Sequence, residues 1–256
     1  MDLPVMNFDR GEDFLEGQIL LVNKPLTWTS FDVVNKVRAT LRHHFGFRKI
    51  KVGHAGTLDP LATGVLVICT GRMTKQIAGL QADDKSYQAV IRLGATTPSD
   101  DAELDVEAWS DASSIALSDV QKAARLWTGD VIQMPPAFSA KKVDGQKAYA
   151  VARKGGELNL KPVALHIAQF AIESLEHKVV DGHAVCDATA LIDCSKGTYI
   201  RALARDLGRE LGVGGHLVGL HRTRSGRFEE GGCSDLALLI QRIQAIPPPQ
   251  PVDAHR

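Results

Sequence analysis

The sequence predicts an α+β fold built on a mainly antiparallel or mixed sheet. Segments typical of strands recur along the chain, yet no regular series of crossover helices separates them. The chain has 256 residues, 44% of them hydrophobic and 23% charged, which is the composition of a globular protein with a sizeable core. We expect one folded region over residues 1–245 and a Pro-rich, disordered tail over residues 246–256.

In the N-terminal part of the chain, short apolar runs predict strands and one helical repeat predicts a helix. Thr29 or Ser30 can cap a helix, because the apolar residues that follow recur at helical spacing from Val33 to Leu41. The other elements expected here are strands at 19–22, 65–69 and 87–93 and a glycine-rich loop at 53–64.

In the C-terminal part, Ser118 and Gln121 have the spacing of a capping box, which predicts a helix that ends at Gly129. A loop-rich stretch follows over residues 133–162. The remaining expected elements are strands at 163–167 and 184–194, a helix from Ile200 that ends at Gly212, and a last helix capped by Ser234 or Asp235.

The charges are segregated along the chain, although 30 basic and 30 acidic residues balance. Residues 33–54 carry six basic residues and no acidic one, and residues 141–161 and 196–227 are also rich in Lys and Arg. Residues 99–119 carry seven acidic residues and no basic one. If the basic segments converge, they form a positive face suited to nucleic acid. Charged runs are also typical of solvated surfaces, so charge alone leaves both interpretations open.

Several classes of chemistry lack their motifs. The sequence has no GxxxxGK[ST], GxGxxG, GxSxG or HExxH pattern, and its four cysteines have no CxxC spacing. We therefore expect neither a metal nor a cofactor. The acidic N-terminus does not resemble a secretory signal, and the longest aliphatic run is too short for a membrane helix, so we expect a cytoplasmic protein with reduced thiols.

The glycine-rich segment 53–64 (GHAGTLDPLATG) contains an aspartate followed by a proline. Pro60 restricts the backbone of Asp59, and a carboxylate on a constrained loop suits nucleophilic or acid–base work. Asp-Pro is also a common turn signal, so the residues by themselves favour an ordinary turn.

Five short motifs, in this order, resemble those of the bacterial tRNA pseudouridine-55 synthases. The resemblance runs from about residue 17 to residue 228. The motifs are residues 24–30 (KPLTWTS), 53–64, 84–87 (DKSY, the tyrosine motif), 133–142 (QMPPAFSAKK, the substrate-gripping insertion) and 194–201 (CSKGTYIR, the arginine motif).

The resemblance implies a pseudouridine synthase fold with an inserted RNA-gripping segment at about residues 128–165. It implies that uridine 55 in the T loop of tRNA is isomerised to pseudouridine: the N-glycosidic bond breaks, the base turns and a C–C bond forms. Asp59 is the implied catalytic aspartate. It attacks the ribose C1′, abstracts the C2′ proton to give a glycal, or attacks C6 of the base. These routes stay open, and all require an ionised Asp59.

The resemblance also implies substrate-binding residues. A guanidinium would keep the aspartate charged, and a tyrosine ring would stack on the flipped uracil. The implied set is Arg201 as the cation paired with Asp59, Tyr87 as the stacking ring, His54 as a support of the flipped uridine, Tyr199 and Leu220 as contacts of the flipped nucleotide, and Lys24 as a support of the loop or a contact of RNA.

The expected partner is the T stem-loop of tRNA, recognised by loop shape and base flipping. We expect a monomer with no obligate protein partner and no membrane. The chain resembles a short form of the family, without the C-terminal RNA-binding domain of many members. Two other functions stay open: an RNA-guided pseudouridine synthase, and a tRNA-folding chaperone with secondary catalysis.

Overall fold

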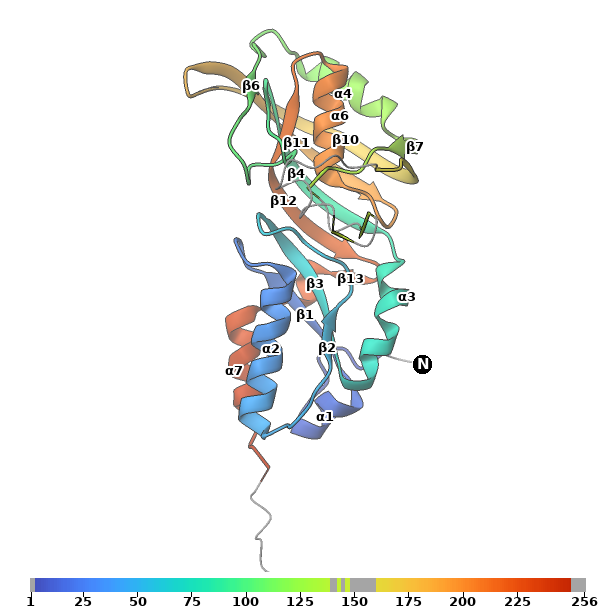
Figure 1. The fold of residues 1–256 in the computed structure, drawn as a ribbon, viewed down its shortest axis with the longest axis vertical. Helices are drawn as coiled ribbons and strands as arrows, with labels where there is room; N and C mark the ends of the chain where they lie inside the picture. Colours follow the sequence, from blue (N-terminus) through green and yellow to red (C-terminus); the bar gives the residue numbers. More distant parts are fainter. Residues whose placement is uncertain (1–2, 139–141, 144–145, 148–159, 250–256) are drawn as a thin grey trace, which may run out of the picture. The chain divides into compact units, whose positions relative to one another are not determined.

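The structure is a computed structural model that describes residues 3–138, 142–143, 146–147 and 160–249 (Figure 1). It divides into two compact units. Unit 1 comprises Met1–Asp83 and His221–Arg256, and unit 2 comprises Asp84–Leu220. A single catalytic domain was expected over residues 1–245, and the division into two compact units does not test that prediction. Much of the expected RNA-gripping segment and most of the expected tail lie outside the described residues.

Unit 1 contains a mixed sheet in the order β14-β1-β3, with β12 next to β3. Strand β1 pairs parallel with β14 and antiparallel with β3, and β2 pairs antiparallel with β3. The elements are α1 (Gly11–Glu16), β1 (Ile19–Lys24), α2 (Ser30–Phe45), β2 (Val52–His54), β3 (Ala62–Thr70), η1 (Gly71–Gln76), α3 (Ile77–Gln81), the end of β12 (Gly215–Ser225), β13 (Phe228–Glu229), η2 (Glu230–Gly232), β14 (Ser234–Asp235) and α7 (Leu236–Gln244).

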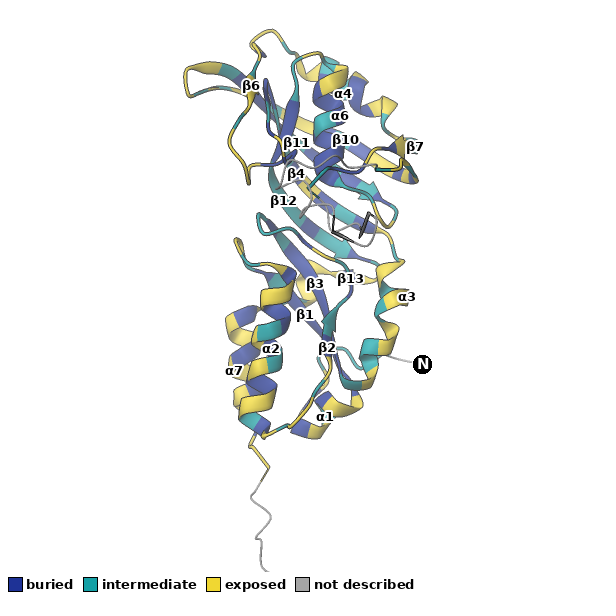
Figure 2. Cartoon of the chain, in the orientation of Figure 1, coloured by how far each residue is buried: buried dark blue, intermediate teal, exposed yellow. Residues whose placement is uncertain are grey.

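Helix α2 begins where its sequence predicts. Thr29 is the N-cap: its hydroxyl accepts the N–H of Asp32 at 3.0 Å, and the Asp32 carboxylate accepts the N–H of Thr29 at 2.9 Å. The helix ends at Gly46, whose φ of 68° suits glycine. The apolar face of α2 is buried, and α2 lies beside α7 (Figures 1 and 2).

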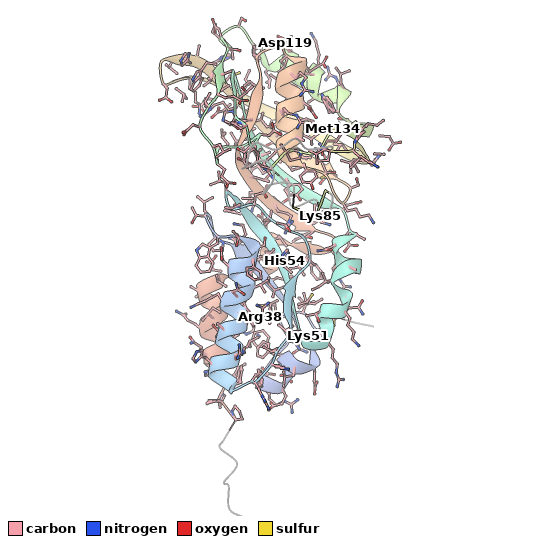
Figure 3. The ribbon with its side chains drawn as sticks, viewed as in Figure 1. Arg38, Lys51, His54, Lys85, Asp119 and Met134 are labelled. Carbon is pink, nitrogen blue, oxygen red and sulfur yellow. The ribbon has the colours of Figure 1, made fainter. Side chains whose placement is uncertain are left out.

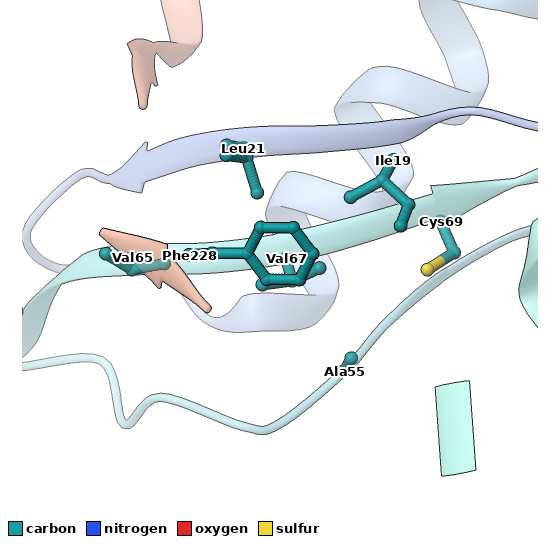
Figure 4. Close-up of a cluster of buried hydrophobic side chains, with 7 residues drawn as sticks. All are labelled: Ile19, Leu21, Ala55, Val65, Val67, Cys69 and Phe228. Carbon is teal, nitrogen blue, oxygen red and sulfur yellow. The ribbon is translucent and has the colours of Figure 1, made fainter. Parts of the chain in front are cut away.

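One cluster of the core of unit 1 lies between its strands and the loop that follows β2. Apolar residues of β1 and β3 point to the same side because side chains alternate along a strand, and Phe228 of β13 packs onto them (Figure 4). The buried cluster consists of Ile19, Leu21, Ala55, Val65, Val67, Cys69 and Phe228. Ala55 is part of this cluster, so the loop is anchored in the core at its start.

Unit 2 contains a sheet in the order β12-β4-β11-β10-β7, in which β4, β11, β10 and β7 pair antiparallel. Helices α4 and α6 accompany it (Figure 1). The predicted fold class, a mainly antiparallel mixed sheet flanked by helices and loops, is confirmed. The elements are β4 (Lys85–Leu93), β5 (Ala95–Thr96), β6 (Ala108–Trp109), α4 (Leu117–Leu126), β7 (Gly129–Gln133), β8 (Lys142–Val143), β9 (Gln146–Lys147), β10 (Val163–Val180), β11 (His183–Cys194), α6 (Ile200–Glu210) and the start of β12.

The structure corrects three sequence predictions. The capping box at Ser118 is wrong: Ala116 is the N-cap of α4, and the Asp119 carboxylate accepts the Ala116 N–H at 3.3 Å. Gly129 does not end the helix, because α4 ends at Leu126 with Trp127 as its C-cap; Gly129 begins strand β7, which pairs with the start of β10. The strand predicted at 163–167 continues to Val180, because β11 pairs with it from Ile167 to Val180. In the part of the chain that the structure describes, no helix is long and apolar enough to cross a membrane.

Candidate active site

The loop between β2 and β3 carries Asp59 and is bonded to helix α2. Leu58 is buried, and its backbone N–H and carbonyl both bond to the Ser30 hydroxyl, at 2.8 and 3.0 Å. The Asp59 carbonyl accepts the N–H of Ala62 at 3.0 Å, which closes a turn into β3. The Asp59 side chain is partly exposed. The loop therefore presents a carboxylate on a fixed backbone.

Lys24 lies at the end of β1, and its ammonium group supports the loop directly. The residue is fully buried, and Nζ donates to the carbonyls of Trp28, Pro25 and Pro60 at 2.6, 2.9 and 3.2 Å. Burial lowers the pKa of Lys24 to about 8, while the nearby charge of Asp59 opposes that shift. The structure thus brings Lys24 to the residue that follows Asp59, where it supports the loop.

Arg222, in β12, contacts the other side of the same loop. Its side chain is 1% exposed, and its guanidinium donates to the carbonyls of Val65 (2.7 Å), Gly56 (3.2 Å) and Thr57 (3.3 Å). Sequence reasoning counted Arg222 only as one base of segment 196–227. No local pattern separates it from Arg224, so the sequence offered no signal of its burial.

Gly64 permits the close approach of β3 and β12. Its φ is 98°, and a Cβ there would overlap the carbonyl oxygen of Arg222 and lie 2.7 Å from the Arg222 nitrogen. Both are backbone atoms, which cannot move aside as a flexible side chain can. Glycine at this position therefore lets the Arg222 backbone lie against β3.

His54 ends strand β2 at the start of the loop (Figure 3). Burial lowers the pKa of His54, and the charge of Arg222 lowers it further, against the effect of a hydrogen bond involving the Gly56 backbone. The imidazole is therefore neutral at pH 7. A neutral ring carries one donor and one acceptor, which suits hydrogen bonding to a base or a ribose.

The predicted residues of unit 2 lie on β4, α6 and β12. Tyr87 is 9% exposed and lies on the buried face of β4, opposite Ile192 of β11. Tyr199 is the N-cap of α6, and its backbone exchanges two hydrogen bonds with the Gln133 side chain, at 2.9 and 3.2 Å. Leu220 lies in the middle of β12 and is half-buried.

Arg201 lies in the first turn of α6 and is 6% exposed, so it is not a surface cation. Its guanidinium donates to the carbonyls of Phe138 (2.9 Å) and Ser99 (3.0 Å) and lies 3.4 Å from the Asp101 carboxylate. These contacts fix loop segments of unit 2. The pairing of Arg201 with Asp59 stays a prediction.

A groove of about 760 Å³ in unit 1 has Lys or Arg at seven of its eleven lining residues. Arg38 of α2 and Lys51 before β2 lie beside it, and Arg38 is fixed by Asn35 and the Val52 carbonyl, each at 2.8 Å (Figure 3). The described lining includes no acidic side chain. The basic residues are Arg38, Arg42, Arg48, Lys49, Lys51, Arg72 and Lys75. Segment 33–54 thus contributes most of a local positive surface, to which Arg72 and Lys75 of η1 add.

Comparison with solved structures defines the class of fold. The chain is similar to one in a structure titled "Crystal Structure of a Cbf5-Nop10-Gar1 Complex", with a TM-score of 0.62 and 24% identity over 94% of this chain and 58% of that chain. It is similar to a chain of the archaeal box H/ACA sRNP Nop10-Cbf5 complex, with a TM-score of 0.57 and 24% identity over 90% of this chain and 54% of that chain. At this identity the likeness shows the fold alone, and this chain spans little more than half of those chains.

The chain belongs to the TruB family of pseudouridylate synthases. The model of the family's N-terminal domain matches residues 42–200, and that of the tRNA pseudouridylate synthase B C-terminal domain matches residues 201–245. A relative from Parabacteroides distasonis is 50% identical over 86% of this chain and 91% of its own length. One from Flavobacterium johnsoniae is 40% identical over 91% and 99%. Both are named tRNA pseudouridine synthase B. The predicted family is confirmed, and the chain is an isomerase.

Proposed function

We propose that this enzyme isomerises uridine 55 in the T loop of tRNA and that Asp59 is its catalytic aspartate. The main support for this role is that Asp59 lies on a loop that is hydrogen-bonded to three separate elements of unit 1. Ser30 of α2 bonds to Leu58, Lys24 of β1 bonds to Pro60, and Arg222 of β12 bonds to Gly56 and Thr57. A reacting group contributes most when its position is set before the substrate binds.

The reaction needs an ionised carboxylate and a base removed from its stack. The C1′–N1 bond breaks, a C1′–C5 bond forms, the C5 proton leaves and N1 gains a proton, so the product is an isomer of the substrate. Unstacking the target costs a few kcal/mol, which stacking on Tyr87, at about 1–3 kcal/mol per base, offsets in large part. His54, Tyr199 and Leu220 then contact the flipped nucleotide. Whether Asp59 meets C1′, the C2′ proton or C6 stays open.

The basic groove is the surface that we propose for RNA phosphates. Seven Lys and Arg side chains line it, and neutralised phosphates release counterions on binding. The affinity for a T stem-loop RNA should therefore fall steeply with added salt. Replacing Lys49 and Lys51 by Gln should reduce the slope of log K against log salt by about 0.7–0.9 per lost contact. Lys122→Gln, at an exposed position of α4, is the control. A slope equal to that of the wild type would contradict a phosphate surface in this groove.

Release of tritium from a T stem-loop RNA labelled at C5 of uridine tests the reaction. The purified chain should release tritium without guide RNA or a second protein, because it acts on the stem-loop directly. An RNA with cytidine in place of the target uridine, labelled elsewhere, should release none. Release from the cytidine-substituted RNA would contradict the proposed position, and a need for guide RNA would favour the RNA-guided alternative.

The cellular setting is also a proposal. Modification of tRNA is expected in the cytoplasm, and we propose that the enzyme acts there as a monomer. Fractionation of cells and light scattering of the purified chain test these two statements.

A further inference from the structure

We propose that Arg222 is a positioning residue for the isomerisation: it fixes the backbone on the N-terminal side of Asp59, as Lys24 does on the C-terminal side. This inference rests on the proposed role of Asp59. Arg222 need not touch the substrate; it acts through the carbonyls of Gly56 and Thr57.

The geometry of the guanidinium is the first argument. Nε donates to Val65 of β3, while Nη1 and Nη2 donate to Thr57 and Gly56 of the loop. A planar guanidinium directs its donors in a fixed fork, so three bonds from one group set the loop relative to β3. The single ammonium of a lysine has no such fork.

The burial of the charge is the second argument. Arg222 is among the largest fully buried side chains of the described chain, and a buried cation is costly unless its donors are satisfied. An apolar side chain would fill the same space without that cost. The cation is nevertheless there, with its donors on the loop carbonyls. Its bonds to the loop that carries Asp59 therefore have a functional explanation that packing alone does not give.

The electrostatic surroundings are the third argument. Lys24 is influenced by the charges of both Arg222 and Asp59, so the two buried cations and the carboxylate lie within one local field. The attraction between the charges of Lys24 and Asp59 supports the loop beside the carboxylate. This support comes from within unit 1 and does not depend on Arg201, whose described bonds to Ser99 and Phe138 fix segments of unit 2.

The approach of the strands is the fourth argument. Gly64 has no Cβ, which lets the Arg222 backbone contact β3. From there the side chain reaches Gly56 and Thr57. The two residues act together: Gly64 leaves space for the Arg222 backbone, and the Arg222 side chain bonds to the loop.

The test uses the full chain with Arg222→Ala and Arg222→Lys, and with Arg224→Ala as the matched control. Arg224 lies on the same strand, and its guanidinium donates to the Gly226 carbonyl, outside the loop. Single-turnover rate, KM, and the Kd for a T stem-loop RNA are measured. We expect Arg222→Ala to lower the rate about 10²-fold, since a small displacement of a reacting group has an effect of this size. The Kd for RNA should stay near the wild-type value.

Chemical rescue separates positioning from general stability. Guanidinium ion, at concentrations far below those that unfold proteins, should enter the space left by Arg222→Ala and restore much of the rate, whereas ammonium ion should not. Arg222→Lys keeps the charge but not the fork, so its rate should stay well below the wild type. Arg224→Ala should be unaffected and should not respond to guanidinium.

Three results would overturn the inference. They are a wild-type rate in Arg222→Ala, a loss confined to RNA affinity, or a loss without rescue in a folded variant. If Arg222→Ala does not fold, Arg222→Lys decides: a wild-type rate overturns the inference, and a reduced rate with unchanged RNA affinity supports it. Asp59→Asn is run in parallel. If Asp59→Asn is active, the proposed catalytic role of Asp59 is refuted. If Asp59→Asn is inactive while the Arg222 variants react at the wild-type rate, only the positioning role of Arg222 is refuted.

Discussion

Substitution of Gly64 by alanine tests the contact between β3 and β12 that brings Arg222 to the catalytic loop. The added Cβ would overlap the carbonyl oxygen of Arg222 and lie 2.7 Å from its nitrogen. The backbone at Gly64 has a φ of 98°, which side chains other than glycine rarely adopt. Strain and overlap therefore act together at this position.

The expected loss of stability has two parts. A left-handed backbone costs an alanine about 1–2 kcal/mol. Displacing well-packed groups costs about 1–3 kcal/mol more, so the free energy of unfolding should fall by about 2–5 kcal/mol. For a chain of this size the melting temperature falls about 2–4 °C per kcal/mol, which gives a decrease of roughly 4–20 °C. The isomerisation rate should fall as well, because Arg222 would be displaced.

Thermal and urea unfolding, followed by circular dichroism, measure the effect. Gly46→Ala is the matched control, because Gly46 has a φ of 68° but no atom within 4 Å of an added Cβ. The control should show the cost of the backbone alone. If Gly64→Ala is no less stable than Gly46→Ala, and turns over normally, the argument from close approach is refuted.

Three further predictions concern ionisable groups. The isomerisation rate should fall as the pH rises through about 8, because Lys24 then loses the proton that it donates to its three carbonyl partners. In Lys24→Met this decrease of the rate at high pH should be absent. The same decrease in the variant would contradict the role of Lys24. Burial raises the pKa of Asp187, but hydrogen bonds from Arg92 and Lys178 outweigh it and lower the pKa below the usual value. Because the two cations that remain are partly exposed, Asp187→Asn should cost about 1.5–3 kcal/mol of unfolding free energy at neutral pH. This difference should shrink as the pH falls below about 4, and urea titrations that show it constant would count against the ion pair. Burial raises the pKa of each of the four thiols to about 11, so a thiol reagent at pH 8 should label the native protein slowly. The half-buried Cys233 should be labelled first, and Cys233→Ser should therefore lack the fastest phase of labelling.

Local sequence patterns predicted the elements whose ends are marked by their own residues. The start of helix α2 was predicted from its N-cap threonine and its helical apolar repeat, and the structure confirms both. The start of α4 was misplaced because Asp119 caps it through the backbone of Ala116, whereas Ser118 only has the right spacing. Strand β7 was missed because a five-residue strand gains its order from pairing with β10, which is distant in sequence.

The candidate site could be predicted only in part, for the same reason. Asp59 stands in a segment with glycines and a proline, so both its constraint and its family resemblance can be read locally. The contacts that hold its loop are not local: Arg222 reaches Gly56 and Thr57 from more than 160 positions along the chain. Before the fold is known, a buried arginine of this kind looks like any other basic residue in a charged segment.

The measurement that tests the role of Asp59 best is the single-turnover rate of Asp59→Asn on a T stem-loop RNA, with RNA affinity measured in the same preparation. Asparagine keeps the size of the side chain but removes the negative charge that every route requires. We predict no detectable pseudouridine and an RNA affinity equal to that of the wild type, with Asp235→Asn, an exposed aspartate of unit 1, fully active. Formation of pseudouridine by Asp59→Asn at a rate near that of the wild type would contradict a catalytic role of this carboxylate.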